Sequence, residues 1–328
     1  MNRFVFAAFL IGTVSGTATA IVIRHDKADQ LYKDLGANAK YNPVGKIQYT
    51  TSSSTGRATG NYIGVGTDGK KWMVTGAHVL DNNLESAKFT VGGKTYDIEI
   101  TSTFWRTNWE EGKGDIAVGR ILDPDNTLTM APARYWKGRI PIPAALGDRL
   151  TGTIVGFGDT GTGNTGANTD SDVKRGMMNR IDALDLKYNN GGDTLYGYLS
   201  DFDNDTTGKN TLNKADFAAA NFNDGQTSDK AWLDLEGQGA KGDSGGGLWA
   251  DVGGQHVMIG IASAVSRLGS VATSTTHYGA YTQSAPFDDE FADHVKRWTG
   301  IAPVPEPATL AALGLGLGFL VRRRPRRS

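Results

Sequence analysis

Short segments of alternating apolar and polar residues, separated by glycine-containing turns, fill the middle of the chain. Residues 61–65 and 71–75 lie on either side of a Thr-Asp-Gly turn, and residues 88–91 and 94–100 lie on either side of a Gly-Gly turn. Both pairs predict β-hairpins, because such turns reverse the chain between two strands. Another strand is predicted over 149–157. The pattern therefore predicts a protein built mainly of β-strands.

One helix is predicted near the C-terminal end. Over residues 288–298, Phe291, Val295 and Trp298 recur at intervals of four and three residues, which places their side chains on one face of a helix.

The first twenty residues have the composition of a signal peptide. Met1-Asn2-Arg3 is basic, residues 4–14 are apolar, and Ala18-Thr19-Ala20 has the small residues of a cleavage site. Residues 1–20 are therefore predicted to be a secretory signal peptide that a signal peptidase removes. An uncleaved membrane anchor is the alternative, although so short an apolar stretch spans a bilayer poorly.

The other end of the chain has three parts. Pro305-Glu306-Pro307 is followed by an apolar segment over 308–321 and an arginine-rich segment over 322–327. This arrangement resembles the PEP-CTERM sorting signal of Gram-negative bacteria. The resemblance implies that residues 301–328 associate transiently with the membrane, are removed by an exosortase, and direct the protein to the cell surface or the extracellular space. A plain tail anchor with a cytoplasmic basic end is the alternative, and it too leaves the rest of the chain outside.

Composition excludes several classes of function. The 328 residues include no cysteine, so disulfides, thiolate metal sites and thiol redox chemistry are excluded. Removing Arg3 and the five tail arginines lowers the basic residues from 34 to 28, against 35 acidic residues, which leaves a net charge of −7. This charge argues against nucleic acid as a partner.

The candidate chemistry centres on Gly242-Asp243-Ser244-Gly245-Gly246. Its glycines let the backbone lie close to a bound acyl group, and the N–H groups of Gly242 and Ser244 can form an oxyanion hole. A serine hydroxyl needs a base at neutral pH, and His78 carries the side chain whose ordinary pKa lies nearest neutrality. Asp115 is the candidate to fix the tautomer of that histidine. Taken singly, a core histidine, a strand-edge aspartate and a glycine-rich turn are the alternatives.

The chain order His78, Asp115, Ser244 resembles the chymotrypsin-like (trypsin-like) serine proteases, whereas subtilisins and α/β-hydrolases use other orders. The resemblance implies hydrolysis of protein or peptide substrates through a Ser-His-Asp triad and an acyl-enzyme, with no cofactor and no metal.

The resemblance extends over about residues 21–300, because segments 258–263 and 279–282 are also similar to strands of that family. It implies an all-β fold of two six-stranded antiparallel β-barrels, roughly 21–140 and 141–300, followed by a C-terminal helix.

The resemblance assigns a substrate pocket to five residues: Gln238, Ser263, Ala264, Val265 and Gly279. Gln238 occupies the position of the acid on the pocket floor of trypsins, and Glu236 is the nearest carboxylate. Val265 stands where a glycine usually admits a large side chain. Small or uncharged P1 residues are therefore expected in preference to Arg and Lys.

The resemblance also implies an activation ion pair. In the family, a terminus that begins Ile-Val inserts beside the serine and pairs with the aspartate that precedes it. Here the predicted signal peptidase site lies directly before Ile21-Val22, and the aspartate is Asp243. Export itself would then create the activating terminus. In the alternative, Ile21 begins a leader and another donor holds Asp243.

Other features give weaker signals. Residues 188–229, rich in Asn, Asp, Gly and Thr, are expected to form a surface insertion. Within it Asp201, Asp203 and Asp205 alternate as in a calcium loop but lack its glycine and its terminal acid, which favours a solvated turn and leaves calcium binding open. Four histidines fit no metal motif and are expected to be surface or packing residues: His25, His256, His277 and His294.

Two functions follow from the sequence. The first is an exported serine endopeptidase of the trypsin-like type. The alternative is a catalytically silent protein that keeps the protease fold and binds partners at the cell surface or in a biofilm matrix.

Overall fold

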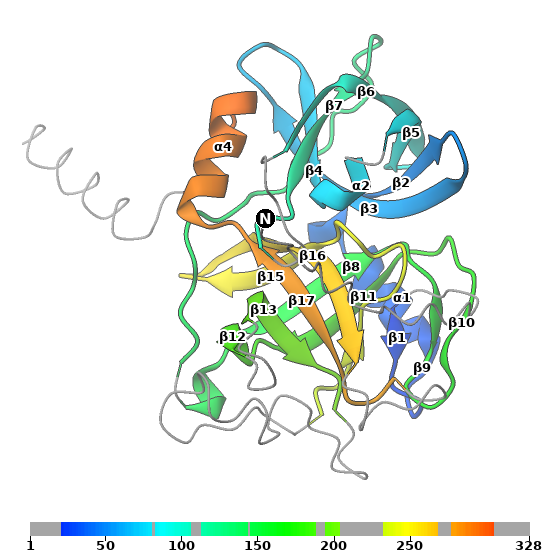
Figure 1. The fold of residues 1–328 in the computed structure, drawn as a ribbon, viewed down its shortest axis with the longest axis vertical. Helices are drawn as coiled ribbons and strands as arrows, with labels where there is room; N and C mark the ends of the chain where they lie inside the picture. Colours follow the sequence, from blue (N-terminus) through cyan, green and yellow to red (C-terminus); the bar gives the residue numbers. More distant parts are fainter. Residues whose placement is uncertain are drawn as a thin grey trace, which may run out of the picture.

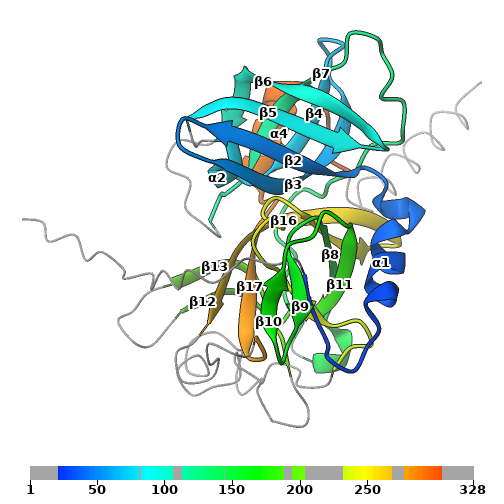
Figure 2. The same ribbon diagram turned by 90° about the vertical axis from the view of Figure 1, so that its right-hand side faces the viewer.

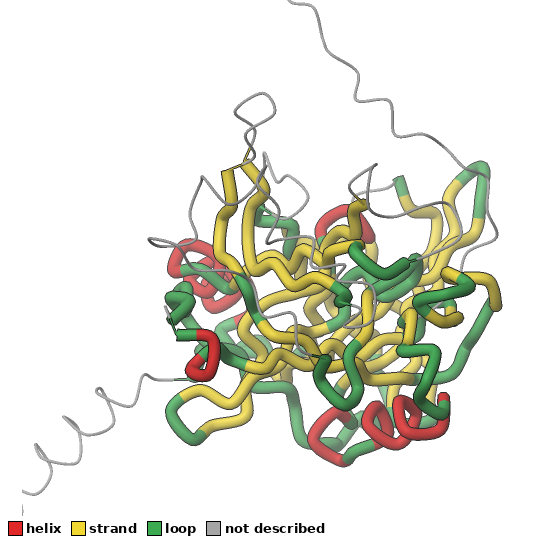
Figure 3. The backbone as a smooth tube through the Cα atoms, turned by 90° about the horizontal axis from the view of Figure 1, so that it is seen from below, coloured by secondary structure: helices red, strands yellow, loops and turns green. Residues whose placement is uncertain are grey.

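The computed structural model describes residues 21–80, 83–105, 113–143, 145–187, 194–203, 232–267 and 277–304. The predicted signal peptide, Asp205 and nearly all of the predicted sorting tail lie outside these residues. In the described part, strands far outweigh helices (Figure 3). Two β-sheet assemblies lie one against the other (Figure 1).

The first assembly is a closed antiparallel barrel of six strands. Its strands, in the order in which they pair, are β2 (Val44–Thr51), β3 (Thr55–Val65), β4 (Lys71–Thr75), β7 (Ala117–Leu122), β6 (Lys94–Trp105) and β5 (Leu84–Val91). Pairing of β5 with β2 closes the barrel. Alternate apolar residues such as Ile47, Met73 and Phe89 are fully buried inside it. Both predicted hairpins, β3–β4 and β5–β6, are present.

The second assembly is a curled seven-stranded antiparallel sheet. Its strands, in pairing order, are β11 (Arg175–Arg180), β8 (Thr151–Gly156), β15 (Gly247–Val252), β16 (Gln255–Arg267), β17 (Ala280–Pro286), β13 (Thr194–Asp201) and β12 (Ala183–Lys187). The all-β fold with a six-stranded barrel is confirmed. The second half differs in strand number and stays open, since no pairing joins β11 to β12 in the described part of the chain.

A small sheet stands beside the second assembly and contains the first described residues. Its four strands, in pairing order, are β10 (Gly166–Thr169), β9 (Thr160–Thr162), β1 (Val22–Ile23) and β14 (Gly237–Gln238). β1 pairs with β9 on one side and with β14 on the other. The segment after the predicted cleavage site is therefore an inner strand of a sheet.

Helices occupy the edges of the two assemblies. They are α1 (Asp29–Ala37), the 3₁₀ turn η1 (Ala39–Tyr41), α2 (Ala77–Leu80), the 3₁₀ turn η2 (Leu146–Asp148) and α4 (Asp289–Thr299). The predicted C-terminal helix is α4; the Asp288 side chain caps its first turn by accepting from the N–H of Phe291 at 2.9 Å, and Gly300 ends it with a φ of 74°. The unpredicted α1 lies along β11 (Figure 2), where its Asp29 pairs with Arg175 at 2.6 Å.

The two assemblies share one apolar core, to which α4 also contributes. Ile63 and Val74 of the barrel, Met258 and Ile261 of the second sheet, and Phe291 of α4 belong to one cluster of buried side chains. Since burial of each such side chain is worth about 1.5–3 kcal/mol, this cluster fixes the relative position of the two assemblies.

One sequence prediction was wrong. Residues 188–229 were expected to form a surface insertion, but Thr194–Asp201 forms β13, which pairs with β17 and β12 within the second sheet. Leu195 and Leu199 of this strand pack in one apolar cluster, and Tyr198 is buried in another. Residues 204–231 lie outside the described residues.

Candidate active site

His78 lies in α2, the single turn that follows β4. Gly76 lies between β4 and α2. A Cβ atom at this position would lie 3.0 Å from the His78 ring, so the absence of a side chain at Gly76 leaves room for the ring. Nδ1 of His78 lies 2.7 Å from Oδ2 of Asp115, and the backbone N–H of His78 donates to Oδ1 of Asp115 at 3.0 Å. Asp115 is fully buried, and its carboxylate therefore holds both the ring and the backbone of His78.

A second group holds the Asp115 carboxylate from the opposite assembly. The Ser263 hydroxyl, in β16 of the second sheet, donates to Oδ2 of Asp115. Ala262, the neighbour of Ser263, bonds to the serine loop (residues 242–246): its C=O accepts from the N–H of Gly245 at 2.8 Å, and its N–H donates to the C=O of Gly246 at 2.7 Å. Through β16 the structure brings His78, Asp115 and the serine loop to one place between the two assemblies.

The backbone groups of the serine loop are almost completely used. All five carbonyl oxygens of residues 242–246 accept hydrogen bonds, and the N–H groups of Asp243, Gly245 and Gly246 donate to Ala240, Ala262 and Asp243. Within the described part of the chain, the N–H groups of Gly242 and Ser244 have no acceptor. Buried backbone groups are nearly always paired, so two donors of one loop without an acceptor in the described part of the chain are available to a ligand.

The hydroxyl of Ser244 makes no hydrogen bond with the described residues, His78 included. Ser244 is partly exposed, and so is the side chain of His78, 22% of which is accessible. Among the described residues, the structure therefore shows the His78–Asp115 pair formed and no partner for the Ser244 hydroxyl. Bonds of this kind are often long in unliganded structures and tighten when substrate binds.

Ile21 and Asp243 lie together. Asp243 is 1% exposed, and its carboxylate accepts from the N–H groups of Gly158 at 2.9 Å, Ala240 at 3.0 Å and Ile21. Burial raises the pKa of Asp243 to about 7, against the opposing effect of these donors. The charge of the buried Arg175 lowers this pKa too, but burial of the carboxylate outweighs it. While Ile21 is joined to Ala20, its nitrogen adds no charge of its own.

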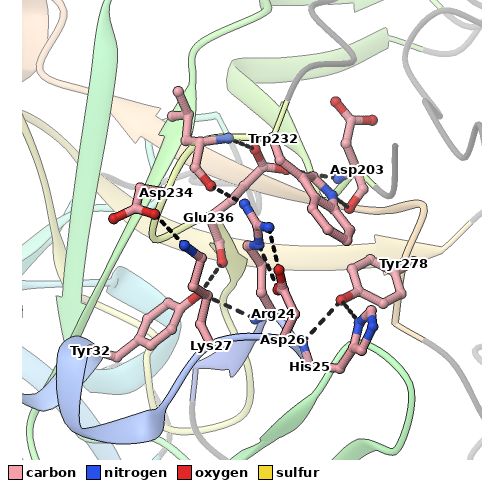
Figure 4. A network of polar contacts seen from close by, with 11 residues as sticks. Arg24, His25, Asp26, Lys27, Tyr32, Asp203, Trp232, Asp234, Glu236 and Tyr278 are labelled. Atoms are coloured by element: carbon pink, nitrogen blue, oxygen red, sulfur yellow. Dashed lines mark hydrogen bonds and ion pairs between the residues drawn. The ribbon is translucent and has the colours of Figure 1, made fainter. Parts of the chain in front are cut away.

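Arg24 fastens the segment that follows β1 (Figure 4). Its guanidinium pairs with Asp26 at 2.6 Å, donates to the C=O of Leu233 at 2.8 Å, and lies 3.9 Å from the centre of the Trp232 ring. These contacts tie residues 24–26 to residues 232–233. These contacts, together with the bond between Ile21 and Asp243, therefore hold the first described residues in place.

Glu236 belongs to the same network (Figure 4) and does not reach a pocket floor as a free acid. Its carboxylate accepts from the N–H groups of Asp203 at 2.9 Å and Leu233 at 2.8 Å. The Tyr32 hydroxyl donates to its backbone C=O at 2.8 Å. Burial raises the pKa of Glu236 to about 8, which disfavours its charged form at neutral pH.

The predicted pocket residues lie around β14, β16 and β17. Gln238 is fully buried, and its Oε1 lies 3.2 Å from Nδ1 of His277, an unpredicted neighbour. The N–H of Gly239 donates to the Thr282 hydroxyl at 3.3 Å. Val265 is 39% exposed. The other predicted pocket residues are Ser263, Ala264 and Gly279, of which Ser263 contacts Asp115.

Sequence reasoning missed two contributors from β3. Thr59 and Asn61, both fully buried, bond to the serine loop across the interface between the assemblies. It also missed a cavity of about 950 Å³ beside the loop, which Tyr49, Arg57 and Lys241 help to line. The residue types of these strand and cavity positions are common in strands and loops. Only their position in the folded chain shows that they lie beside the serine loop.

The described residues include no group of three or more acidic or histidine side chains placed to hold a metal ion. Among the same residues, no helix has the length and apolar character needed to cross a membrane.

Comparison with known proteins identifies the C-terminal end. Residues 303–327 match the PEP-CTERM protein-sorting motif. The chain therefore carries a PEP-CTERM sorting motif, which indicates export to the cell surface or the extracellular space. No curated protein sequence matches the chain.

Solved structures with a similar fold include chymotrypsin-like serine proteases. HL collagenase has a TM-score of 0.49 at 16% identity, covering 81% of this chain and 97% of the collagenase. The thermostable serine protease AL20 from an extremophilic microorganism has a TM-score of 0.46 at 11% identity, covering 80% and 96%. Protease Anisep from Arthrobacter nicotinovorans has a TM-score of 0.47 at 10% identity, covering 79% and 96%. Similarity at this level carries no information about activity.

Proposed function

We propose that this protein is an exported serine endopeptidase that hydrolyses peptide bonds through Ser244, His78 and Asp115. The observation that carries the proposal is that, within the described part of the chain, the N–H groups of Gly242 and Ser244 have no acceptor, whereas the other backbone groups of the loop are all engaged. In a loop that only reverses the chain, we would expect these two donors to be paired like the others.

The contacts of His78 and Asp115 support the following mechanism. Asp115 accepts from Nδ1–H of His78, which leaves Nε2 as the basic nitrogen. Nε2 takes the hydroxyl proton of Ser244 while Oγ attacks the substrate carbonyl. The N–H groups of Gly242 and Ser244 then bind the oxyanion, and His78 returns the proton to the leaving amine. Water, activated by the same nitrogen, hydrolyses the acyl-enzyme.

A polypeptide substrate fits the surroundings of the loop. The 950 Å³ cavity runs beside Lys241, the residue before Gly242, and the hairpin β2–β3 forms its other wall. Neither Ser244 nor His78 lines this cavity, and we propose that a polypeptide bound at Ser244 extends past Lys241 into it. This favours an endopeptidase over an enzyme that releases single terminal residues.

The alternative function, a catalytically silent binding protein of the cell surface or biofilm matrix, needs no activated serine. The two are separated by hydrolysis of denatured casein. We expect the wild-type chain to cleave it and Ser244→Ala, which removes one partly exposed oxygen, to be inactive with an unchanged melting temperature. Equal activity of the two proteins would reject the assignment.

We further propose that signal peptidase, by cutting after Ala20, creates an Ile21 ammonium that pairs with Asp243. The Ile21 nitrogen already donates to this carboxylate, and β1 holds it in place from both sides. Cutting would add a positive charge at a position the chain already occupies. N-terminal sequencing of exported protein tests this, and a mature terminus other than Ile21 would contradict it.

For the pocket we propose a preference for small or uncharged P1 side chains. Gln238 offers no charge, and Glu236 is engaged by backbone N–H groups. We expect the side chain of Val265, which is 39% exposed, to narrow the entrance. We propose that an exosortase removes the sorting tail in a Gram-negative host.

A further inference from the structure

Strand β3 of the barrel lies directly against the serine loop of the other assembly. Side chains two residues apart on a strand point to the same face, so Thr59 and Asn61 face the same way. Both are fully buried. Figure 1 shows β3 on the side of the barrel that faces the second sheet.

Thr59 makes two bonds to the loop, one from its side chain and one from its backbone. Its hydroxyl donates to the C=O of Gly242 at 2.9 Å, and its N–H donates to the C=O of Ser244 at 2.9 Å. The same hydroxyl oxygen accepts from the N–H of Phe157 at 3.0 Å. Thr59 thus holds the carbonyl groups on both sides of the Asp243–Ser244 peptide. The N–H of that peptide is one of the two loop donors that have no acceptor among the described residues.

Asn61 continues the contact along the loop. Its Nδ2 donates to the C=O of Gly245 at 2.9 Å, and its Oδ1 accepts from the N–H of Gly247 at 3.2 Å. Together, Thr59 and Asn61 engage four backbone groups between residues 242 and 247.

The loop needs such external support. Gly242 has a φ of 97° and Gly245 a φ of 85°. Glycine adopts positive and negative φ values about equally readily, so its own conformational preference does not fix the backbone here. Neither residue has a side chain to anchor it. The N–H of Gly242 belongs to the peptide before Gly242, and the N–H of Ser244 belongs to the peptide between Asp243 and Ser244, so rotation of either peptide would turn a donor away from the oxyanion. Thr59 bonds to the carbonyl groups of the two peptides that flank the Asp243–Ser244 peptide, and fixing these neighbours opposes that rotation.

We propose that Thr59 and Asn61 are positioning residues for the oxyanion hole: by holding the carbonyl groups of the serine loop from the opposite assembly, they keep the N–H groups of Gly242 and Ser244 aimed at one point. The inference rests on the proposed function, since it assigns a role within the same reaction. Both side chains are fully buried, so we assign them no contact with the substrate and no proton transfer.

The positioning role predicts an effect on kcat rather than on KM. Charge develops on the substrate oxygen only as the transition state is approached, so an ill-aimed donor weakens transition-state binding more than ground-state binding. Loss of one oxyanion donor costs about 10²–10³ in kcat, and loss of its support should cost less, about 10–100-fold.

The test compares Thr59→Val, Thr59→Ala and Thr59→Ser in the full chain. Valine and alanine lose the hydroxyl, whereas serine keeps it. The matched control is Thr299→Val. Thr299 is 2% exposed, and its hydroxyl donates to the C=O of Val295 at 2.8 Å and accepts from the N–H of Ile301 at 3.0 Å, the same pair of bonds as that of Thr59, in α4.

Hydrolysis of p-nitrophenyl acetate and the rate of Ser244 labelling by an alkyl fluorophosphonate are measured for each variant, with the melting temperature. We expect Thr59→Val and Thr59→Ala to lower kcat about 10–100-fold with KM within about twofold, and Thr59→Ser to recover to within about threefold of wild type. Thr299→Val should lose stability but keep kcat.

A folded Thr59→Val or Thr59→Ala protein with wild-type kcat overturns the inference, and so does an equal loss in Thr299→Val. If valine prevents folding, alanine decides, because it fits the same space. Absence of fluorophosphonate labelling in the wild-type protein would instead reject the proposed function, whatever the Thr59 variants do.

Discussion

The Asp243 carboxylate makes the strongest quantitative prediction, because a cut before Ile21 would change its environment. With Ile21 still joined to a preceding residue, the pKa of Asp243 is about 7, against 3.8 for a free side chain. At about 1.4 kcal/mol per pKa unit, the charged carboxylate then costs about 4 kcal/mol of unfolding free energy above about pH 7. A free Ile21 ammonium would remove most of this cost.

The perturbation is one added residue. Two chains are compared, one beginning with a free Ile21 and one with a methionine before it. At about pH 8 we expect urea unfolding to show that the free-Ile21 chain is more stable by about 2–4 kcal/mol. The value falls below the full value of about 4 kcal/mol because burying the ammonium group removes it from water. Breaking a buried pair by removal of one partner typically costs about 3–5 kcal/mol, which is consistent with this range.

The stability difference between the two chains depends on pH through the pKa values of Asp243 and of the Ile21 amine. In the extended chain the raised pKa means that Asp243 is protonated when folded below about pH 7, so the cost shrinks as pH falls toward the unfolded value of 3.8. In the free-Ile21 chain the ammonium gains a carboxylate partner, so its folded pKa lies above the free value of about 7.7–8.0, and its contribution is lost as pH rises through that folded pKa. The stability difference should therefore be largest near pH 8 and small near about pH 4.

Asp243→Asn in both chains is the control. The amide carries no charge, so the stability difference between the two termini should disappear. Equal stability of the two original chains at about pH 8, or a difference that survives Asp243→Asn, would refute the proposed ion pair.

Three further predictions concern the triad, the pocket and the tail. Ser244→Ala and His78→Ala should each lower peptide hydrolysis by about 10⁴-fold or more, and the double variant should lose little beyond that, since a triad acts as a unit; losses that multiply would contradict this. In a peptide library we expect cleavage after small or uncharged residues, and a profile dominated by arginine would show that an acid such as Glu236 reaches the P1 side chain. Protein released from a host with an exosortase should, by intact mass, lack the residues beyond Pro307, whereas a full-length end would reject removal of the tail.

Local patterns were enough to predict much of the fold. The hairpins β3–β4 and β5–β6 and the helix α4 follow from alternation, turn residues and apolar spacing within about a dozen neighbouring positions. The strand pairing of the second assembly was harder to predict. β13 was taken for part of an insertion because its flanks are rich in Asn, Asp and Gly, and its pairing with β17 joins segments about 80 positions apart, which no local pattern encodes.

The candidate site shows the same limit. His78, Asp115 and Ser244 stand in short segments of recognisable sequence, and the structure brings His78 and Asp115 into contact. Thr59 has no such signature, because its role depends on a bond to Gly242, 183 positions away. A buried strand threonine at position 59 is locally unremarkable, and only the tertiary contact distinguishes it from Thr75 or Thr153.

The central claim is that Ser244 is an activated nucleophile. The most direct measurement is the mass of each peptide after the folded chain reacts with an alkyl fluorophosphonate, which bonds only to an activated serine. We predict one adduct, on Ser244, absent from Ser244→Ala and strongly reduced in His78→Ala. A folded wild-type protein that forms no adduct, or an adduct that persists in Ser244→Ala, would contradict the account.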